Sequence, residues 1–139
     1  MKTITAFASR VLGNTPQESE QTAFRTKVVD ASQVEYIEFY LTIIFLSESD
    51  NDTANISVFL KSPQQHKGAA PFQQTIKSGK KGEQLGIALN VKMPFRSEGQ
   101  GNYSYMVEIN GSVDKEELLF ELKYQDAPNP TSSPIQQVQ

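Results

Sequence analysis

Residues 50–52, Asp-Asn-Asp, place oxygen ligands in succession with the density that calcium favours. Asp50 and Asp52 are therefore the candidate metal ligands. A calcium loop also needs a glycine and a distal glutamate at set positions, whereas Asn55 and Ile56 follow here. Because these side chains also bond to local backbone, the run is interpreted first as a polar turn between strands. Calcium binding is the alternative.

Side chains for acid–base or nucleophilic catalysis do not form a constellation. His66, the one histidine, lies in the loop sequence Gln-Gln-His-Lys-Gly, and no serine has a nucleophile-elbow context. Glu116 and Glu117 are adjacent, so on a strand they point to opposite faces and cannot flank one glycosidic bond. With no cysteine, thiolate catalysis and cysteine-ligated metals are excluded. We predict no catalytic residue, no cofactor and no enzymatic activity.

Three lysines, Lys77, Lys80 and Lys81, lie around Gly79 and Gly82 and could attract phosphate. The run lacks the glycine spacing and the following Ser or Thr of a phosphate-binding loop. It is interpreted as a solvated hairpin tip, where lysine also discourages unwanted strand pairing.

Tyrosine is the remaining side chain that could bind a ligand, by stacking on sugars or anchoring a protein. The five tyrosines are Tyr36, Tyr40, Tyr103, Tyr105 and Tyr124. Tyr103 and Tyr105 share the parity of Val107 and Ile109, which indicates the core face of a strand. The favoured interpretation is partial burial, with the hydroxyl groups reaching the rim.

The clearest structural pattern runs over Asn102–Tyr124. Tyr103, Tyr105, Val107 and Ile109 alternate with Asn102, Ser104, Met106 and Glu108 in the period of a half-buried strand. Asn110-Gly111 suits a tight hairpin turn. Leu118, Phe120, Leu122 and Tyr124 then form the apolar face of a returning strand. A second apolar surface must cover this hairpin.

Other segments alternate in the same way. The expected strands are Thr3–Ala8, Phe24–Val29, Asn55–Lys61, Phe72–Lys77 as a short edge strand, and Leu85–Met93. Residues 13–20 have the composition of an exposed loop, and Pro16 excludes a strand ladder there. Val34–Leu46 is the most apolar segment; its β-branched and aromatic residues favour a long central strand, with a helix as the alternative.

A single domain is expected from 139 residues. We place a β-sandwich domain at residues 1–126 and a disordered tail rich in Pro, Ser and Gln at 127–139, because the tail has little to bury. About seven to eight short strands suggest a two-layer antiparallel β-sandwich, with a closed β-barrel as the alternative. The formal net charge of −3 counts against nucleic acid as a partner.

The order of features resembles a family of small bacterial β-sandwich proteins of unknown function with immunoglobulin-like topology. The matching features are a strand ending in a proline turn, here Ile56 to Pro63, a Gly-x-Tyr start at Gly101, and the final hairpin. The resemblance covers roughly Thr3 to Tyr124. It implies an immunoglobulin-like sandwich and no catalytic residues.

Apolar side chains on both faces of the expected strands suggest a contact surface. Phe39, Met106 and Leu119 are the candidate interface residues, because they lie opposite to apolar neighbours on the same strands. We predict a binding or assembly module that acts through protein contacts, including self-association. The alternative is a small-ligand site for lipid or carbohydrate. No membrane span is expected, because the most apolar run has the length of a strand, and a cytoplasmic location is predicted.

Overall fold

The computed structural model describes residues 1–30, 36–64, 72–94 and 99–125, with the backbone alone at residue 94. Most of these residues belong to two sheets, in which most neighbouring strands run antiparallel. The first sheet has the order β2-β1-β4-β7 and the second β3-β9-β8-β5-β6. The strands are β1 Lys2–Ser9, β2 Ala23–Phe24, β3 Thr26–Asp30, β4 Tyr36–Leu46, β5 Thr53–Lys61, β6 Phe72–Lys77, β7 Gln84–Pro94, β8 Gly101–Ile109 and β9 Ser112–Gln125.

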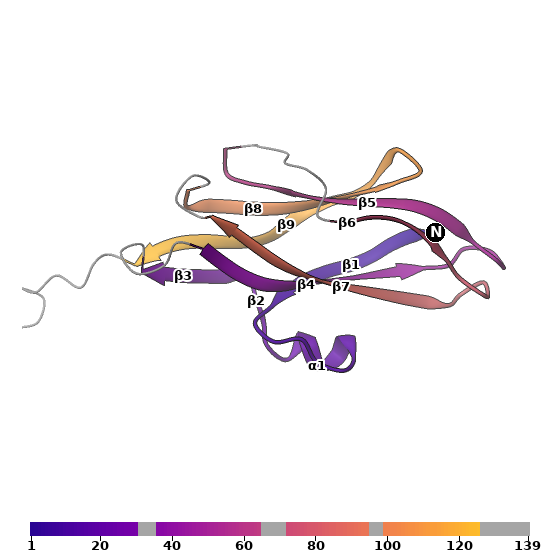
Figure 1. The fold of residues 1–139 in the computed structure, drawn as a ribbon, viewed down its shortest axis with the longest axis horizontal. Helices are drawn as coiled ribbons and strands as arrows, with labels where there is room; N and C mark the ends of the chain where they lie inside the picture. Colours follow the sequence, from indigo (N-terminus) through magenta and orange to yellow (C-terminus); the bar gives the residue numbers. More distant parts are fainter. Residues whose placement is uncertain (31–35, 65–71, 95–98, 126–139) are drawn as a thin grey trace, which may run out of the picture.

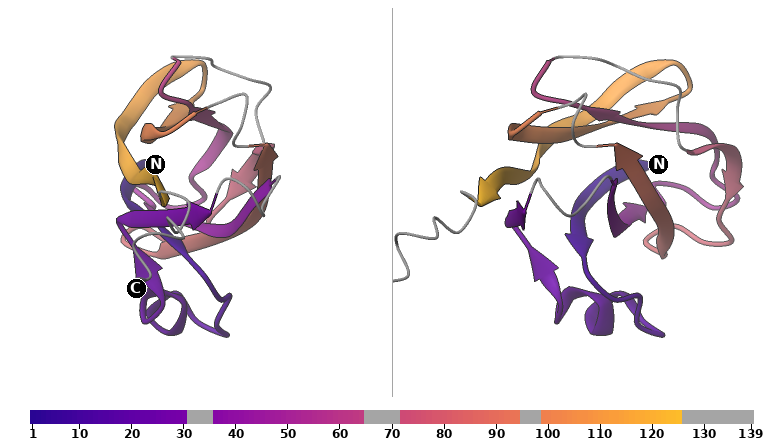
Figure 2. Two further views of the ribbon diagram at one scale, coloured as in Figure 1. Left: turned by 90° about the vertical axis from the view of Figure 1, so that its left-hand side faces the viewer. Right: turned by 60° about the vertical axis from the view of Figure 1, so that its left-hand side comes forward.

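The two sheets pack as two layers that splay apart along one side (Figures 1 and 2). The predicted all-β, two-layer fold is confirmed. Among the described residues, the one helix is α1, Pro16–Glu20, which lies on the outer face of the β1-β4-β7 layer (Figure 1). Its five residues are far fewer than a helix needs to cross a membrane.

The N-terminal part of the chain joins both layers. The expected strand at Phe24–Val29 is divided at Arg25: β2 pairs with β1 in the first sheet, and β3 runs parallel to β9 in the second. The backbone N–H of Glu121 donates to the Arg25 carbonyl at 2.8 Å. This hydrogen bond holds the residue between β2 and β3 against β9. The segment therefore closes one side of the sandwich.

Aromatic rings from both sheets meet at Phe120 of β9. Its ring lies 5.2 Å from that of Phe39 in an edge-to-face arrangement, 5.2 Å from Tyr103 in a stacked one, and 5.4 Å from Phe24. Phe39 belongs to β4, so this cluster connects the layers. Aliphatic residues of alternating parity on β4, β5 and β8 extend the core in both directions.

The final hairpin is confirmed, with positive φ at both Asn110 (52°) and Gly111 (85°), as a tight turn requires. Its internal register corrects the predicted pattern. A bulge between the pairs Tyr103↔Phe120 and Ser104↔Leu118 inserts an extra residue, which reverses the alternation. As a result Leu118 is 53% exposed and Leu119 is 4% exposed, the opposite of the assignment made from strict alternation.

The other strands also follow the sequence pattern. β4 is a strand throughout Tyr36–Leu46, so the helical alternative is wrong there, and β6 is the expected edge strand. Residues 31–35 of the long apolar segment and the proposed tail at 127–139 lie outside the described residues.

The bulge register can be tested by a pair of substitutions two positions apart. Phe120→Ala should lower the free energy of unfolding by about 3–5 kcal/mol, because it opens a cavity in the aromatic cluster. Leu118→Ala should change it by less than about 0.5 kcal/mol, because its side chain faces solvent. Urea denaturation measures both. Similar losses for the two variants would contradict the register.

Candidate functional site

The outer face of the first sheet carries an unusual succession of side chains along β4. Ile37, Phe39 and Leu41 point into the core, so the alternate positions point outward. These outward positions hold Tyr36, Glu38, Tyr40, Thr42 and Ile44. The aromatic residues are at the open end of the strand, and the last two positions are covered by the α1 region.

Tyr36 is the most exposed aromatic side chain on this face, with 48% of its surface accessible. The Lys92 Nζ from the neighbouring strand β7 lies 4.9 Å from the centroid of its ring, within cation–π distance. Tyr40 is half-buried on the same face, beside its register partner Asn90. We call Tyr36, Tyr40 and Lys92 the tyrosine strip.

Residues 10–22 form a compact loop that contains α1 and folds over the middle of this face. Its ends meet where the Arg10 N–H donates to the Thr22 carbonyl at 3.1 Å. Inside it, the Gly13 N–H donates to Ser19 Oγ at 2.9 Å, and the Thr15 side chain caps α1 by accepting from the Glu18 N–H. A closed, self-packed surface loop of this kind is an Ω-loop.

Pro16 fixes the loop to the sheet. It occupies the first turn of α1, where its missing N–H has no cost. Its ring packs against Gly86 of β7, and a Cβ added at Gly86 would lie 3.5 Å from Pro16 Cγ and 3.4 Å from Ile44 Cδ1. The prediction of an exposed loop at 13–20 is therefore incomplete, since Pro16 starts a helical turn that docks on β7.

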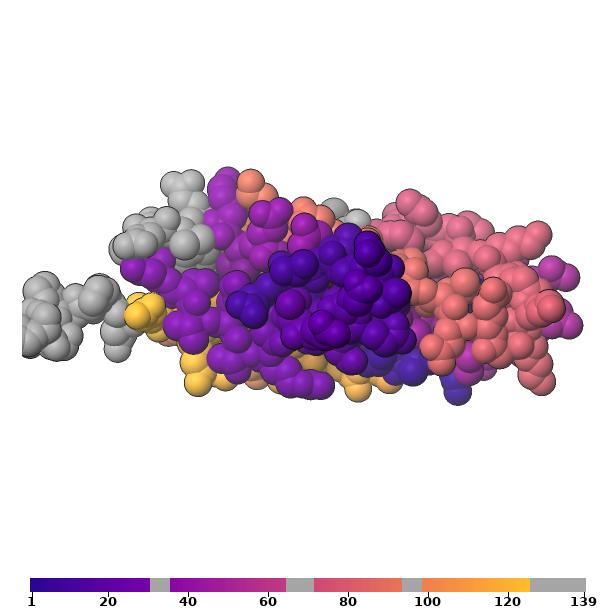
Figure 3. All heavy atoms as spheres, turned by 90° about the horizontal axis from the view of Figure 1, so that it is seen from below, coloured from indigo at the N-terminus to yellow at the C-terminus, as the bar shows by residue number. Residues whose placement is uncertain are grey.

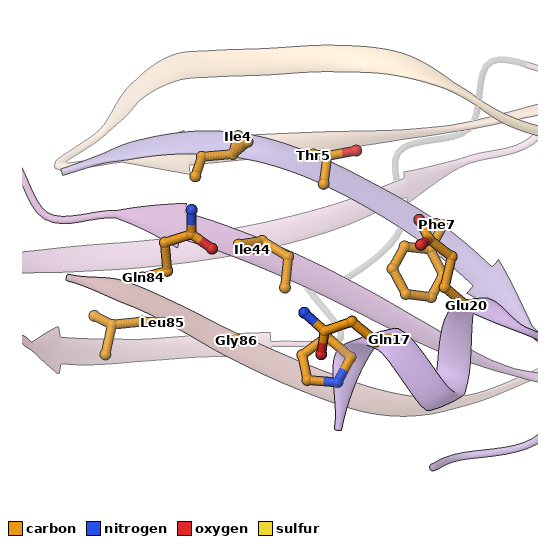
Figure 4. A pocket seen from close by; sticks show the side chains of 10 residues that line it. Ile4, Thr5, Phe7, Gln17, Glu20, Ile44, Gln84, Leu85 and Gly86 are labelled. Atoms are coloured by element: carbon orange, nitrogen blue, oxygen red, sulfur yellow. The ribbon is translucent and has the colours of Figure 1, made fainter. Parts of the chain in front are cut away.

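Two hollows flank Pro16 between the Ω-loop and the sheet, on the face that Figure 3 views directly, with the N-terminal residues in indigo over its middle. The first, which we call the Phe7 hollow, has a volume of about 350 Å³. Figure 4 shows Phe7, Ile44 and Leu85 along its walls, with Gln17 and Glu20 contributed by α1 at one side. It combines apolar walls with amide and carboxylate groups.

The second hollow, which we call the Thr42 hollow, has a volume of about 250 Å³. Its lining residues are Leu12, Gly13, Asn14, Thr15, Pro16, Ser19, Thr42, Gly86, Ile87 and Ala88. Thr42 is 3% exposed, and its Oγ1 has no hydrogen-bond partner among the described residues. A buried hydroxyl without a partner is uncommon in folded proteins and calls for a physical reason.

The predicted calcium ligands have protein partners instead. Asp50 Oδ1 accepts from the Lys81 N–H at 2.9 Å. Asp52 Oδ2 accepts from the Glu48 N–H at 2.9 Å and lies 2.7 Å from the Met1 ammonium, which Glu48 also contacts at 2.8 Å. Within the described residues, no group of three or more His, Cys, Asp and Glu side chains could hold a metal ion.

These contacts change the acidity of both partners. The hydrogen bond from the Met1 ammonium, together with that from the Glu48 N–H, holds the pKa of Asp52 below its usual 3.8. Desolvation by itself would lower the pKa of the Met1 ammonium. The hydrogen bonds to Asp52 and Glu48 outweigh desolvation and raise this pKa above 8.0.

The three predicted interface residues are buried within the chain. Phe39 and Leu119 belong to the core, with 1% and 4% exposure, and Met106 is 5% exposed beside its register partners Phe59 and Glu116. The prediction that these side chains form an exposed apolar patch is therefore wrong. The error for Leu119 comes from the bulge in β9.

The interpretation of Tyr103 and Tyr105 as core residues with hydroxyls at the rim is confirmed. Tyr103 Oη donates to the Gly99 carbonyl at 2.5 Å, and Tyr105 Oη donates to Glu117 Oε1 at 2.8 Å. Burial, followed by the bond to Glu117, raises the pKa of Tyr105. Glu116 instead pairs with Lys61 at 2.5 Å, and His66 lies outside the described residues.

No protein-family profile matches the chain, and no curated protein matches it in sequence. Its fold is similar to part of the Pseudomonas fluorescens alkylpurine DNA glycosylase AlkC, solved in complex with DNA containing an abasic-site analogue. The TM-score is 0.50 at 17% sequence identity, over 88% of this chain and 30% of the glycosylase chain. The chain thus spans about a third of that protein's length, and the likeness is one of fold.

The likeness to a DNA-bound protein contradicts two predictions made from the sequence. The predicted assembly module acting through protein contacts, with its small-ligand alternative, is wrong, and so is the exclusion of nucleic acid as a partner. The exclusion used the formal net charge of −3. A net charge averages over the whole surface and says nothing about where aromatic and cationic side chains meet.

The Met1–Asp52 pair gives a stability profile that depends on pH. Because the pKa of Asp52 is lowered, its stabilising effect is present above 3.8 and is lost as the pH falls through the folded value. Because the ammonium pKa is raised, its effect is present below 8.0 and is lost as the pH rises through the folded value. Asp52→Asn should therefore lower the melting temperature most between about pH 4 and pH 8.

Differential scanning calorimetry across this range measures the effect. Asp50→Asn is the matched control, because its carboxylate accepts from one backbone N–H and contacts no ammonium. The effect of Asp50→Asn on the melting temperature should not decrease as the pH becomes alkaline. A difference between wild type and Asp52→Asn that stays constant from acid to alkaline pH would contradict the ion pair.

Proposed function

We propose that this chain is a DNA-contacting β-sandwich module that binds nucleic acid on the outer face of the β1-β4-β7 layer. The observation that carries the proposal is the tyrosine strip, where an exposed ring, Tyr36, is paired with the Lys92 ammonium on an open sheet face. The fold likeness to a protein solved with DNA supports the same direction.

Single nucleotides and nucleic-acid strands bind to protein surfaces through a combination of aromatic and cationic side chains. A base can stack on a tyrosine ring whatever its identity, and a nearby ammonium contacts the adjacent phosphate. Tyr36 and Tyr40 are four residues apart on one strand face, which separates them by about 13 Å. With Lys92 beside Tyr36, the tyrosine strip provides two rings and one cation on one face of the sheet.

The modest charge of this face limits the electrostatic part of binding. Lys92 has Glu38 as its register partner, and the whole chain has a formal net charge of −3. Binding through Lys92 releases about one counterion, so the slope of log K against log salt is about −1. Stacking then supplies most of the affinity.

We further propose that the module contributes binding and not catalysis. The tyrosine strip has the Glu38 carboxylate beside Lys92, and the register partner of Tyr40 on β1 is Ser9, which is fully buried with its hydroxyl donating to the Val11 carbonyl. The glycosylase similarity covers 30% of that chain, which is compatible with a single module in a larger protein.

The immunoglobulin-like family resemblance and the cytoplasmic location remain predictions. The neighbouring order β9-β8-β5 is that of strands G, F and C in an immunoglobulin sandwich.

Fluorescence anisotropy with a fluorescein-labelled 12-nucleotide DNA, as a single strand and as a duplex, tests the proposal. Wild type should bind at least one of the two forms. Tyr36→Ala should weaken binding by about 1–3 kcal/mol, because it removes a stacking surface without disturbing the core. Lys92→Gln should weaken it less and make the salt dependence shallower.

Lys80→Gln is the matched control for charge. Lys80 is also exposed, but it lies in the turn between β6 and β7, away from the tyrosine strip. This control should bind as wild type does. No binding of either DNA form, or an equal loss with Lys80→Gln and Lys92→Gln, would contradict the proposed surface.

A further inference from the structure

We infer that Glu38 makes the tyrosine strip select unpaired bases that carry an exocyclic amino group, namely cytosine, adenine and guanine, over thymine. The inference rests on the proposed function and identifies the class of ligand that the same face takes. It depends on three features: the place of Glu38 between the two tyrosines, a carboxylate without a partner among the described residues, and the open sheet surface around it.

Glu38 lies between the two rings on the outer face of β4. Residues of one parity share a face of a strand, so Tyr36, Glu38 and Tyr40 follow one another at intervals of about 7 Å. The Glu38 side chain is exposed, as is that of Asn90 on β7, the register partner of Tyr40. A base that stacks on either tyrosine therefore has its edge within reach of the Glu38 side chain.

The Glu38 carboxylate makes no hydrogen bond or ion pair within the part of the chain that the structure describes. Lys92 is its register partner on β7, a position where opposite charges can pair across two strands. The Lys92 ammonium instead lies over the Tyr36 ring, 4.9 Å from its centroid. The carboxylate oxygens of Glu38 are consequently open to a ligand.

A carboxylate distinguishes bases by the groups on their edges. An ionised carboxylate only accepts hydrogen bonds, and a recurrent contact in nucleic-acid complexes is that of Glu or Asp with the N4 amino group of cytosine. Adenine and guanine also offer amino groups. The pairing edge of thymine has one N–H between two carbonyl oxygens, which a carboxylate repels. Asn90 can both donate and accept, so the discrimination depends on Glu38.

The same carboxylate limits how the face attracts nucleic acid. Glu38 repels phosphate and offsets the charge of Lys92, its register partner. Binding then depends on stacking and on contacts with base edges rather than on charge. Both kinds of contact need bases whose faces and edges are free.

A duplex does not meet these requirements. Its base faces are stacked on one another, and its pairing edges are occupied. The base edges in the major groove are reached by a helix or a two-stranded ribbon, whereas β4 lies between β1 and β7 inside a sheet. The ligand of this face is therefore a single strand.

Fluorescence anisotropy with labelled 12-nucleotide oligo(dC) and oligo(dT) tests the inference, because the two strands have equal numbers of phosphates and rings of equal size. Wild type should bind oligo(dC) about three- to tenfold more tightly, the effect of one hydrogen bond. Glu38→Gln should reduce this ratio to within about twofold, because an amide can accept from cytosine N4 and donate to thymine O4.

Glu20→Gln is the matched control for charge. Glu20 is exposed on α1, which covers the same face of the sheet away from the tyrosine strip. Removing its charge should change the affinity for both strands by the same factor and leave their ratio as in wild type. The melting temperature of Glu38→Gln should stay within about 2 °C of wild type, because the substituted side chain is exposed.

The outcomes separate this inference from the proposed function. A preference for oligo(dC) that disappears in Glu38→Gln and persists in Glu20→Gln supports selection by Glu38. Equal or reversed affinities of wild type for the two strands, or a preference that Glu38→Gln leaves unchanged, overturns the selection and leaves the DNA-contacting face in place. No binding of any DNA by wild type overturns both.

Discussion

The packing of Phe120 against rings from both sheets is the contact on which the remaining structure depends. Phe120 and Tyr103 stack across the β8–β9 hairpin, and Phe39 meets Phe120 from β4 in the opposite layer. Because Phe39 points inward, its neighbours along β4 must point outward. The same contact that joins the layers therefore determines which face displays Tyr36, Tyr40 and Thr42.

Much of this arrangement could be predicted from the sequence, because alternation is a local property of a strand. The pattern of β4 and the Asn110-Gly111 turn specified their elements correctly. The bulge in β9 could not be predicted, because the extra residue depends on pairing with β8 and reverses parity within one strand. Leu118 and Leu119 are both leucine, so residue type does not indicate which of the two is buried.

The candidate site was harder to predict than the fold because its parts are distant in sequence. Tyr36 and Tyr40 carried a signal, since two tyrosines share one parity opposite to Ile37 and Phe39. The docking of Pro16 on Gly86 had no signal in the sequence, because it joins a loop near the N-terminus to β7 through tertiary packing alone. The hollow at Thr42 exists only once that contact has formed.

The Ω-loop and the sheet face therefore pack as one structural unit. The loop is held in shape by its own polar side chains, and the two hollows form where it lies on the sheet. At Gly86 an added Cβ would make only ordinary van der Waals contacts with Pro16 and Ile44, so the docked loop does not require glycine there. The position that does is Gly13 inside the loop, where an added Cβ would lie 2.3 Å from Glu18 Cβ. The loop therefore depends on a small residue for its own internal packing more than for its contact with the sheet.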